Sequence, residues 1–456
     1  MILKVCEMFV MVRRIIIIGA HAAGTDAASA ARKTDRSAKI TLITNQKVAG
    51  YSPCGIPFVL GKHISSFEDL IVFPPSYYQM MKIDLRLETT AKKINVEDKT
   101  VEVEDKNGKK ESLSYDSLIL ATGAYPFVPP IKGREKKGVF TLRTLEDGKR
   151  INQALEKTKS AVVIGAGLIG LEAAVAFVER GIRTTVVELL PQVLPVMLDK
   201  DMARLVQKNL EEKGLNIITG KGVDEILGNG EVSGVSVAGN EISADLVIVA
   251  TGVRPNVQLA KDAGIKLGET GGIKTNMRME TSVKGVYAAG DCAESTNLIT
   301  KKPMLSQLGT TAVRHGKVAG INAAGGYAVF MGCLGSAVTR LFDLEIGATG
   351  LTEFTASRAG IEIVAGSISS KTRADYYPGG KPLRVKILVD KDTERIVGGQ
   401  IIGGEEVTQR INALSFAIQK QMSVRELAKA DTCYAPPVNE TWEPMVLAAE
   451  IAIRRL

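Results

Sequence analysis

Two segments of this chain begin and end alike, and this repeat is the feature that most limits the fold. The first starts at residues 13–19, RRIIIIG, passes into an Ala-rich helical stretch and closes at residues 117–123, SLILATG. The second starts at residues 161–165, AVVIG, and closes at residues 246–252, LVIVATG. Short all-apolar runs are typical of strands buried on both faces of a parallel sheet. The repeat therefore predicts two doubly wound α/β units in tandem.

Each repeat also carries an insert before its closing strand. Residues 94–115 contain the pair Asn107-Gly108, and residues 223–242 contain Gly239-Asn240. Such pairs favour the tight turns that join antiparallel strands. We therefore expect hairpins within both units.

The last part of the chain, from about Gly326, has a different pattern without a glycine-rich nucleotide turn. Strand-like stretches come first and helix-like stretches follow, which indicates an α+β domain. We expect this domain to serve dimerisation. The strand-like stretches are residues 337–342, 361–367, 383–389 and 396–402, and the helix-like ones are residues 406–420, 424–430 and 442–454.

The chain length of 456 residues suits about three domains, since a domain averages roughly 100–200 residues. We expect the first α/β domain to comprise residues 11–145 and 253–326, the second to comprise residues 146–252, and the dimerisation domain to comprise residues 327–456. No apolar run approaches the roughly 20 residues of a membrane span, so we expect no membrane partner. Residues 1–12 lack a cleavage-site pattern and predict no signal peptide, and Met11 is an alternative start.

The charge pattern and the cysteine and histidine content limit which kinds of partner and ligand we expect. The net charge is +8, but basic and acidic residues alternate along the whole chain, so we expect no nucleic-acid partner. Five cysteines form no CxxC pair, and with only three histidines we expect no metal site. Cysteines scattered in this way suit a reducing cytoplasm. They are Cys6, Cys54, Cys292, Cys333 and Cys433.

Residues 165–170, GAGLIG, form a complete GxGxxG turn between a strand and a helix. Gly165 makes the tight turn, Gly167 lets a pyrophosphate approach the backbone, and Gly170 lets helix and strand pack closely. Glu188 stands 23 residues after Gly165, close to the roughly 20 expected for a carboxylate that binds ribose hydroxyls. No Arg or Lys follows in positions 189–191 to offset a 2′-phosphate, so NADH is favoured over NADPH.

The first glycine turn, residues 19–24 with the sequence GAHAAG, keeps only part of this pattern. Gly19 and Gly24 occupy the first and third glycine positions, but His21 stands in place of the second. Thr44 and Asn45 occupy the position of the ribose carboxylate, and both are neutral hydrogen-bonding residues. We expect His21 to fill the space that the glycine leaves, with proton donation near a flavin as the alternative.

A carboxylate further along the chain strengthens this first site. Residues 285–291, GVYAAGD, form a strand that ends in Gly290-Asp291, where a polyol chain can bind. The order of these motifs, together with Ala-Thr-Gly at 121–123 and 250–252, resembles the pyridine nucleotide-disulfide oxidoreductases over nearly the whole chain. The resemblance implies an α/β fold with two Rossmann-like domains, one for FAD and one for NAD, and a C-terminal α+β dimerisation domain.

The resemblance also implies roles for single residues. Asp291 would hold the ribityl chain of FAD, and Glu172, two residues after Gly170, would lie near the flavin and the nicotinamide. The full set of candidate cofactor-binding residues is Gly19, His21, Gly24, Thr44, Asn45, Thr122, Gly123, Gly165, Gly167, Gly170, Glu172, Glu188, Gly252, Gly290 and Asp291.

Residues 51–57, YSPCGIP, indicate the branch of the family. The larger family has a CxxxxC dithiol here, but Val59 stands five residues after Cys54, so an internal disulfide is absent at this place. The segment resembles the single-cysteine branch of coenzyme A-disulfide reductases, persulfide and polysulfide reductases, NADH oxidases and NADH peroxidases. Its Cys-Gly-Ile-Pro form is closer to the coenzyme A-disulfide reductases. The oxidases usually carry Ser-Cys-Gly-Met and a histidine one place after the position of His21.

Residues 376–379, YYPG, and 434–437, YAPP, resemble the two tyrosine motifs of coenzyme A-disulfide reductases. In that group the tyrosines reach across a dimer to the partner's redox cysteine. The resemblance implies a homodimer with Tyr377 and Tyr434 as catalytic candidates beside Cys54. Because the chain stops at Leu456, we expect no rhodanese domain of the kind fused to some persulfide reductases.

Redox chemistry at Cys54 requires a thiolate. We expect a helix that starts near Ile56 to lower the pKa of this thiol through its free N–H groups. The oxidised cysteine would be a mixed disulfide, a persulfide or a sulfenic acid. Tyr377 and Tyr434 would protonate or orient the leaving thiolate.

The sequence thus predicts an FAD-dependent NAD(P)H oxidoreductase that reduces coenzyme A disulfide or a related persulfide or polysulfide. Coenzyme A is therefore a further candidate ligand. One alternative is an NADH oxidase that reduces O2 through a sulfenic acid at Cys54. The other is an electron-transfer flavoprotein subunit that feeds an iron–sulfur partner, with Cys54 unused. We expect a cytoplasmic homodimer with small-molecule substrates.

Overall fold

The computed structural model describes residues 12–456. The predictions about a leader segment, the alternative start at Met11 and Cys6 therefore lie outside the described residues. Among the helices of residues 12–456, none has both the length and the apolar character needed to cross a bilayer.

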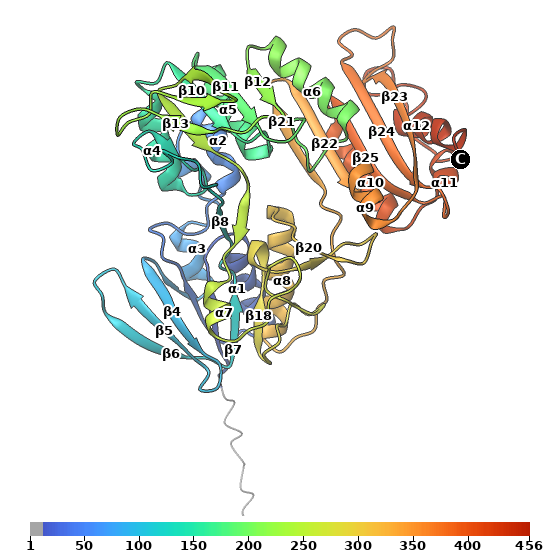
Figure 1. Cartoon of the computed structure of the whole chain (residues 1–456). Coiled ribbons are helices and arrows are strands. Elements are labelled where there is room, and N and C mark those ends of the chain that lie inside the picture. The colour runs from blue at the N-terminus through green and yellow to red at the C-terminus, as the bar shows by residue number, and fades with distance from the viewer. Residues whose placement is uncertain (1–11) are drawn as a thin grey trace, which may run out of the picture.

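The first sheet is parallel throughout and has the strand order β18-β7-β1-β2-β3. Its last strand, β18, comes from a part of the chain more than 160 residues after β7, and it completes the sheet beside β7. The lower part of Figure 1 shows this unit, with α1 and α8 beside β18. The elements are β1 (Arg14–Ile18), β2 (Lys39–Ile43), β3 (Ile83–Arg86), β7 (Ser117–Leu120), β18 (Val286–Ala288), α1 (Ala22–Thr34), α3 (Pro75–Met80), α7 (Gln258–Asp262) and α8 (Gly309–Ala323).

Two glycines of α8 bring this helix into backbone contact with α1. A Cβ at Gly316 would lie 2.1 Å from the carbonyl oxygen of Ala23, and a Cβ at Gly320 would lie 2.2 Å from that of Ala27. Only glycine allows an approach this close. The contact joins the two parts of the chain that build the first sheet.

The second sheet is also parallel and has the order β12-β11-β10-β16-β9. Helix α5 starts directly after the second glycine turn and packs on β10 and β11. Strand β9 belongs to this sheet, although residues 11–145 are expected to form the first domain. The elements are β9 (Val139–Phe140), β10 (Ser160–Ile164), β11 (Arg183–Glu188), β12 (Asn216–Thr219), β16 (Leu246–Val249), α4 (Leu145–Leu155), α5 (Leu168–Glu179) and α6 (Lys200–Glu212).

Both predicted hairpin inserts are present as three-stranded antiparallel sheets. The first turns at Asn107-Gly108 and the second at Ala238-Gly239, with positive φ at both glycines. The strands are β4 (Thr89–Asn95), β5 (Thr100–Asp105), β6 (Lys110–Ser114), β13 (Glu225–Leu227), β14 (Gly234–Val237) and β15 (Asn240–Ser243).

Two short strands connect the first unit to the second. β8 (Ala124–Pro126) and β17 (Val253–Pro255) pair in antiparallel fashion, with Ala124 opposite Pro255. Figure 1 shows β8 between the lower and the upper part of the molecule. The chain therefore leaves and re-enters the first unit at one place.

The C-terminal part forms an antiparallel sheet with the order β21-β22-β25-β24-β23, covered by helices, as expected for an α+β domain. The sequence pattern missed β22, because Gly347 and Gly350 interrupt it. The elements are β21 (Ala337–Leu341), β22 (Leu344–Gly350), α9 (Glu353–Ala359), β23 (Ile363–Lys371), β24 (Pro382–Asp390), β25 (Ile396–Gly403), α10 (Val407–Gln419), α11 (Val424–Leu427) and α12 (Pro444–Ile453).

A buried ion cluster ties the second unit to the C-terminal domain. Lys386 on β24 is 3% exposed, and its Nζ lies 3.1 Å from Asp199, 2.7 Å from Asp201 and 2.7 Å from Glu353. Asp199 also accepts a hydrogen bond from the amide of Gln400 on β25. Asp199 and Asp201 begin α6, so the start of that helix is fixed against the C-terminal sheet.

Candidate functional site

The two glycine turns have the same construction. Gly19 has a φ of +110° and Gly165 a φ of +108°, and a Cβ on either would lie 2.0 Å or 2.4 Å from the carbonyl oxygen of the alanine in the matching Ala-Thr-Gly. The third glycines, Gly24 and Gly170, lie against the carbonyl oxygens of the first, where a Cβ would come within 1.7 Å and 2.1 Å. Each turn is therefore locked between its own helix and its closing strand.

The middle positions of the two turns differ. A Cβ at Gly167 would meet no heavy atom within 4 Å, which leaves open space at the start of α5. At the first turn His21 precedes α1, and its ring packs edge-on against Tyr51 with 4.5 Å between ring centroids. The Nδ1 of His21 is buried and has no hydrogen-bond partner among residues 12–456. Such a nitrogen costs free energy unless a ligand atom satisfies it.

Glu188 is the last residue of β11. Its Oε2 accepts a hydrogen bond from the N–H of Ala166 (2.7 Å), and its Oε1 accepts one from the N–H of Leu190 (2.8 Å). The carboxylate thus lies against the glycine turn, as a ribose-binding group must. The side chains of Leu189 and Leu190 are 70% and 47% exposed and present no charge.

Thr44 and Asn45 follow β2, the strand of the first sheet that corresponds to β11. Thr44 is buried and accepts a hydrogen bond from the N–H of Gln46 (3.3 Å), whereas Asn45 is exposed. Only Asn45 is therefore free to meet a ligand with its side chain, and the binding role of both residues stays a prediction.

The two Ala-Thr-Gly endings hold the crossing strands. Thr122 donates a hydrogen bond to the carbonyl oxygen of Asn256 (2.6 Å), and Thr251 donates one to that of Phe127 (2.6 Å). Gly123 and Gly252 both have positive φ, and a Cβ at Gly252 would meet nothing within 4 Å. The two Ala-Thr-Gly segments thus make equivalent hydrogen bonds at the connection between the two units.

Cys54 lies between the two units. It stands in a 3₁₀ turn, Pro53–Gly55, directly before α2 (Ile56–Leu60), and its side chain is exposed. Helix α2 belongs to the first half of the chain but packs against α4 and α5 of the second unit. Cys54 is thereby presented at the place where the two nucleotide-binding units meet.

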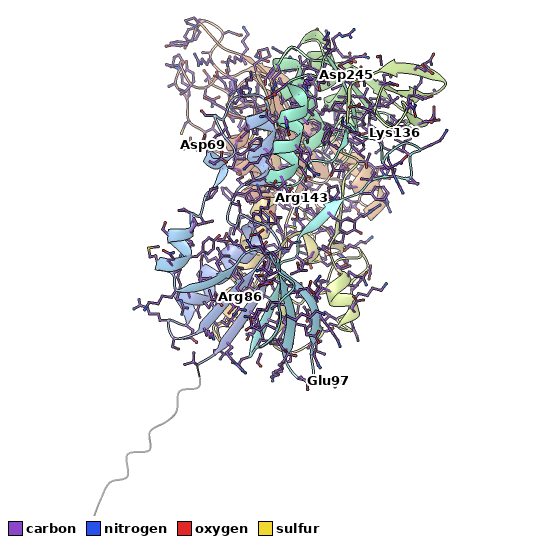
Figure 2. All side chains as sticks on the ribbon, turned by 90° about the vertical axis from the view of Figure 1, so that its left-hand side faces the viewer. Asp69, Arg86, Glu97, Lys136, Arg143 and Asp245 are labelled. Atoms are coloured by element: carbon purple, nitrogen blue, oxygen red, sulfur yellow. The ribbon has the colours of Figure 1, made fainter. Side chains whose placement is uncertain are left out.

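Arg143 is the cation at this place, and no sequence motif marked it. Its Nη2 donates to Asp291 Oδ2 at 2.8 Å, and the same nitrogen would lie 3.6 Å from a Cβ at Gly123. Figure 2 shows Arg143 where the lower and the upper part of the molecule meet.

The expectation that the protein lowers the pKa of Cys54 is wrong for the protein by itself. Although the Cys54 side chain is exposed, the protein packed around it partly desolvates the thiolate and raises the pKa of Cys54, and the charges of Glu172 and Asp291 raise it further. Arg143 acts in the opposite direction. The helix after Cys54 has only five residues and starts with Ile56-Pro57, so its dipole is small and one of its N–H groups is missing.

Tyr51 fixes the other side of this place. It is 4% exposed; its hydroxyl donates to Gln46 Oε1 (2.7 Å) and accepts from the N–H of Leu145 (3.3 Å). Burial raises its pKa to about 12, so the hydroxyl keeps its proton at neutral pH. Tyr51 thus holds a fixed position against the ring of His21.

Glu172 is the fifth residue of α5, a helix that packs against β21 of the C-terminal domain. Its Oε1 accepts a hydrogen bond from the hydroxyl of Thr339 on β21 (2.7 Å). Burial raises the pKa of the Glu172 carboxyl, and the bond from Thr339 opposes this shift. Thr339 is a second residue that the sequence patterns did not mark.

His315 on α8 holds the Gly290-Asp291 turn from behind. Its Nδ1 accepts a hydrogen bond from the N–H of Gly290 (3.3 Å), and its Nε2 bonds the hydroxyl of Ser295 (2.9 Å). Burial lowers the pKa of His315 to about 4, so the ring is neutral at pH 7. A neutral ring has one acceptor and one donor nitrogen, which matches these two partners.

The predicted tyrosines lie in loops of the C-terminal domain. Tyr434 hydrogen-bonds Tyr376 through their hydroxyls, and both side chains are exposed. Tyr377, the residue predicted from the motif, is 38% exposed and follows Tyr376 in the same loop. Cys433 is also exposed. The catalytic roles of Tyr377 and Tyr434 remain predictions.

The residues present fit the two cofactors that the resemblance implies. For FAD, the first turn offers the orphaned Nδ1 of His21 and the locked glycines, and Asp291 supplies a carboxylate held by Arg143. For the nicotinamide nucleotide, the second turn offers open space at Gly167 and a carboxylate at Glu188. These are the acceptors, donors and close backbone approaches that dinucleotides require.

Comparisons with known proteins agree with this geometry. Residues 13–316 match the family described as pyridine nucleotide-disulphide oxidoreductase, and residues 336–446 match its dimerisation domain. An NADH oxidase of Methanocaldococcus jannaschii is 47% identical over 97% of this chain and 99% of its own length. A CoA-dependent NAD(P)H sulfur oxidoreductase of Pyrococcus abyssi is 38% identical over 96% of this chain and 98% of its own. The solved structure of an NAD-dependent persulfide reductase from A. fulgidus has a TM-score of 0.94 at 39% identity, and the match covers 97% of this chain and 83% of that one.

Proposed function

Because the chain belongs to the pyridine nucleotide-disulphide oxidoreductase family, we propose that it reduces coenzyme A disulfide or a related persulfide or polysulfide with electrons from NADH. It is an FAD-dependent NAD(P)H oxidoreductase. It is a homodimer, because it carries the dimerisation domain of that family. The finer proposal concerns Cys54 as the single redox thiol.

The observation that carries the proposal is the position of Cys54. Its exposed thiol lies between the two nucleotide-binding units, and Arg143 and Asp291 act on it from the FAD side. Among residues 12–456 the other cysteines are two buried ones, Cys292 and Cys333, and the exposed Cys433, and all four are free. A lone thiol of this kind exchanges with a disulfide that comes from outside the chain.

The Cys54 thiolate attacks one sulfur of the substrate disulfide, forms a mixed disulfide and releases the first thiolate. FAD, when bound, would carry the two electrons of NADH to this site. Two electrons and one proton then release the second thiol from the mixed disulfide and restore the Cys54 thiolate. Arg143 favours the thiolate form of Cys54 before the attack and after its release, because its charge lowers the pKa of Cys54.

Side chains at the nicotinamide turn and in the loops of the C-terminal domain support the reaction. The carboxylate of Glu188 would accept hydrogen bonds from the ribose hydroxyls of NADH. The neutral Leu189 beside it offers no cation to a 2′-phosphate, which favours NADH over NADPH. Tyr377 and Tyr434 of the partner subunit would protonate or orient the leaving thiolate. Tyr376 joins them as a third candidate, since its hydroxyl is the one that bonds Tyr434.

Anaerobic titration with NADH tests the role of Cys54. The wild-type enzyme is expected to take up more than one equivalent of NADH per FAD and to show thiolate-to-flavin charge-transfer absorbance. The Cys54→Ser variant is expected to lose both, and to lose reduction of coenzyme A disulfide, while Cys433→Ser keeps all three. If Cys54→Ser retains full turnover with disulfides and with oxygen, the proposal is wrong, and transfer of electrons to an iron–sulfur partner becomes the better account.

The relative at 47% identity is named NADH oxidase, and this observation favours a second candidate function. In that case NADH would reduce O2, and Cys54 would cycle through a sulfenic acid. Trapping with dimedone during turnover under oxygen distinguishes the two functions. Stoichiometric labelling of Cys54, with oxygen consumed faster than coenzyme A disulfide, would support the oxidase.

We also propose a cytoplasmic location, because the four cysteines among residues 12–456 form no pair and the described helices include no membrane span. Fractionation of the source cells followed by immunoblotting tests this location. Recovery of the protein in an extracellular or membrane fraction would contradict it.

A further inference from the structure

One hydrogen bond joins the dimerisation domain to the redox site of the same subunit. Thr339 Oγ1 donates to Glu172 Oε1 over 2.7 Å. Thr339 lies on β21 and is 6% exposed, and Glu172 lies on α5, which packs against β21. The bond therefore connects two domains through buried or half-buried groups, where hydrogen bonds have well-defined geometry.

In the part of the chain that the structure describes, Thr339 alone holds the side chain of Glu172. Within residues 12–456, Thr339 is the only side chain that hydrogen-bonds this carboxylate, and no lysine, arginine or histidine forms an ion pair with it. A hydroxyl donor stabilises the ionised form of a half-buried carboxyl. Without Thr339, the side chain of Glu172 would be free to turn towards water.

The charge of Glu172 acts on Cys54. Cys54 lies in the 3₁₀ turn that precedes α2, and α2 packs on α5. The charged groups that act on the thiol are Glu172 from α5, Asp291 from the turn after β18 and Arg143 from the segment after β9. The two carboxylates raise the pKa of Cys54 and the guanidinium lowers it.

We propose that Thr339 is a positioning residue that fixes the carboxylate of Glu172 beside the thiol of Cys54. The dimerisation domain then takes part in the redox site of its own subunit, in addition to joining two subunits. The inference rests on the proposed function only in treating Cys54 as the redox thiol.

The rate at which iodoacetamide alkylates Cys54, measured against pH in the reduced holoenzyme, tests this proposal. Mass spectrometry of the Cys54 peptide separates its labelling from that of Cys433. In Thr339→Val the carboxylate turns to solvent, so the thiol ionises more readily. A fall of half a pKa unit makes labelling at pH 7 about threefold faster, since labelling follows the thiolate fraction. Glu172→Gln is expected to give a similar or larger increase, and Thr339→Ser to keep the wild-type profile.

A second buried threonine provides the matched control. Thr349 on the neighbouring strand β22 is 2% exposed and hydrogen-bonds Ser336 over 2.7 Å. Thr349→Val is expected to leave the labelling of Cys54 unchanged, and Thr339→Val is expected to add nothing in a Glu172→Gln background. A wild-type profile in Thr339→Val, or an equal shift in Thr349→Val or Thr339→Ser, would overturn the proposal. Labelling needs no turnover, so it remains decisive even if Cys54→Ser proves active.

Discussion

The guanidinium of Arg143 donates a hydrogen bond to Asp291, with 2.8 Å between Nη2 and Oδ2. The two residues are 148 positions apart in the chain, and they come from the segment after β9 and from the turn after β18. The pair joins the carboxylate expected to hold FAD to the cation that favours the Cys54 thiolate. One arginine therefore acts on both the flavin side and the sulfur side of the site.

We predict that Arg143→Met weakens both the ionisation of Cys54 and the retention of FAD. The pKa of Cys54 rises, because Arg143 lowers it whereas the neighbouring charges of Glu172 and Asp291 raise it. A rise of one unit makes alkylation of Cys54 at pH 7 about tenfold slower, and FAD is retained less well on dilution. Lys149→Met serves as control, since Lys149 is an exposed residue of α4 that pairs with Glu68. Labelling at the wild-type rate in Arg143→Met would contradict this prediction.

Replacement of Glu188 tests the nicotinamide site. In Glu188→Ala with Leu189→Arg, NADH loses the carboxylate and NADPH gains a cation. Hydrogen bonds to charged groups contribute about 1.5–3 kcal/mol, so KM for NADH is expected to rise roughly 10- to 100-fold while KM for NADPH falls. Steady-state kinetics with both nucleotides measures the change, and Glu212→Gln on the exposed surface of α6 is the control. An unchanged preference for NADH would place the ribose elsewhere.

His315 gives the protein a dependence on pH. Its folded pKa of about 4 lies below the ordinary value of 6.5, so between these values the unfolded chain binds a proton that the folded protein does not. The stability that depends on neutral His315 is therefore complete above pH 6.5 and is lost as the pH falls towards 4. The loss is on the order of 3 kcal/mol, since one pKa unit corresponds to about 1.4 kcal/mol.

Thermal unfolding at a series of pH values checks this dependence. The wild-type midpoint is expected to fall between pH 6.5 and 4, and His315→Asn, less stable at pH 7, is expected to fall less steeply. His63→Asn is the control, because that ring is exposed and pairs with Glu179. Parallel curves for the wild type and His315→Asn would show that another group causes the acid sensitivity.

The buried Lys386 is expected to be one of the most sensitive positions for stability. Lys386→Met leaves Asp199, which is 2% exposed at its side chain, without its cation. Removing one partner of a buried ion pair costs about 3–5 kcal/mol. Urea denaturation is expected to show a clearly lower midpoint for Lys386→Met, whereas Lys391→Met, which removes an exposed pair with Glu362, stays near the wild type. Similar midpoints for both variants would mean that the cluster stabilises little.

The fold was predictable because its determinants are local. Apolar strands, glycine turns and Ala-Thr-Gly endings are short runs of sequence, and their repetition alone indicates two α/β units. Strand β22 was missed because Gly347 and Gly350 remove the side chains that would show a strand pattern.

The site was less accessible from the sequence. Cys54, Asp291 and Glu188 stand in motifs, but Arg143 and Thr339 act through partners 148 and 167 positions away, and no local pattern marks them. The direction of the Cys54 pKa was wrong for the same reason. The short helix that follows Cys54 has little effect on this pKa, whereas desolvation by the surrounding protein and the charge of Glu172, from a distant segment, dominate it.

The pairing of β8 with β17 places the two ends of the nicotinamide unit side by side, with Ala124 opposite Pro255. A segment bounded in this way behaves as a cassette. Recombination between relatives at these two adjacent strands would exchange the whole nicotinamide unit in one event and leave the strand order β18-β7-β1-β2-β3 of the first unit intact. Because Arg143 and Glu172 lie within this segment, such an exchange would change two of the charges that act on Cys54 together with the nicotinamide site.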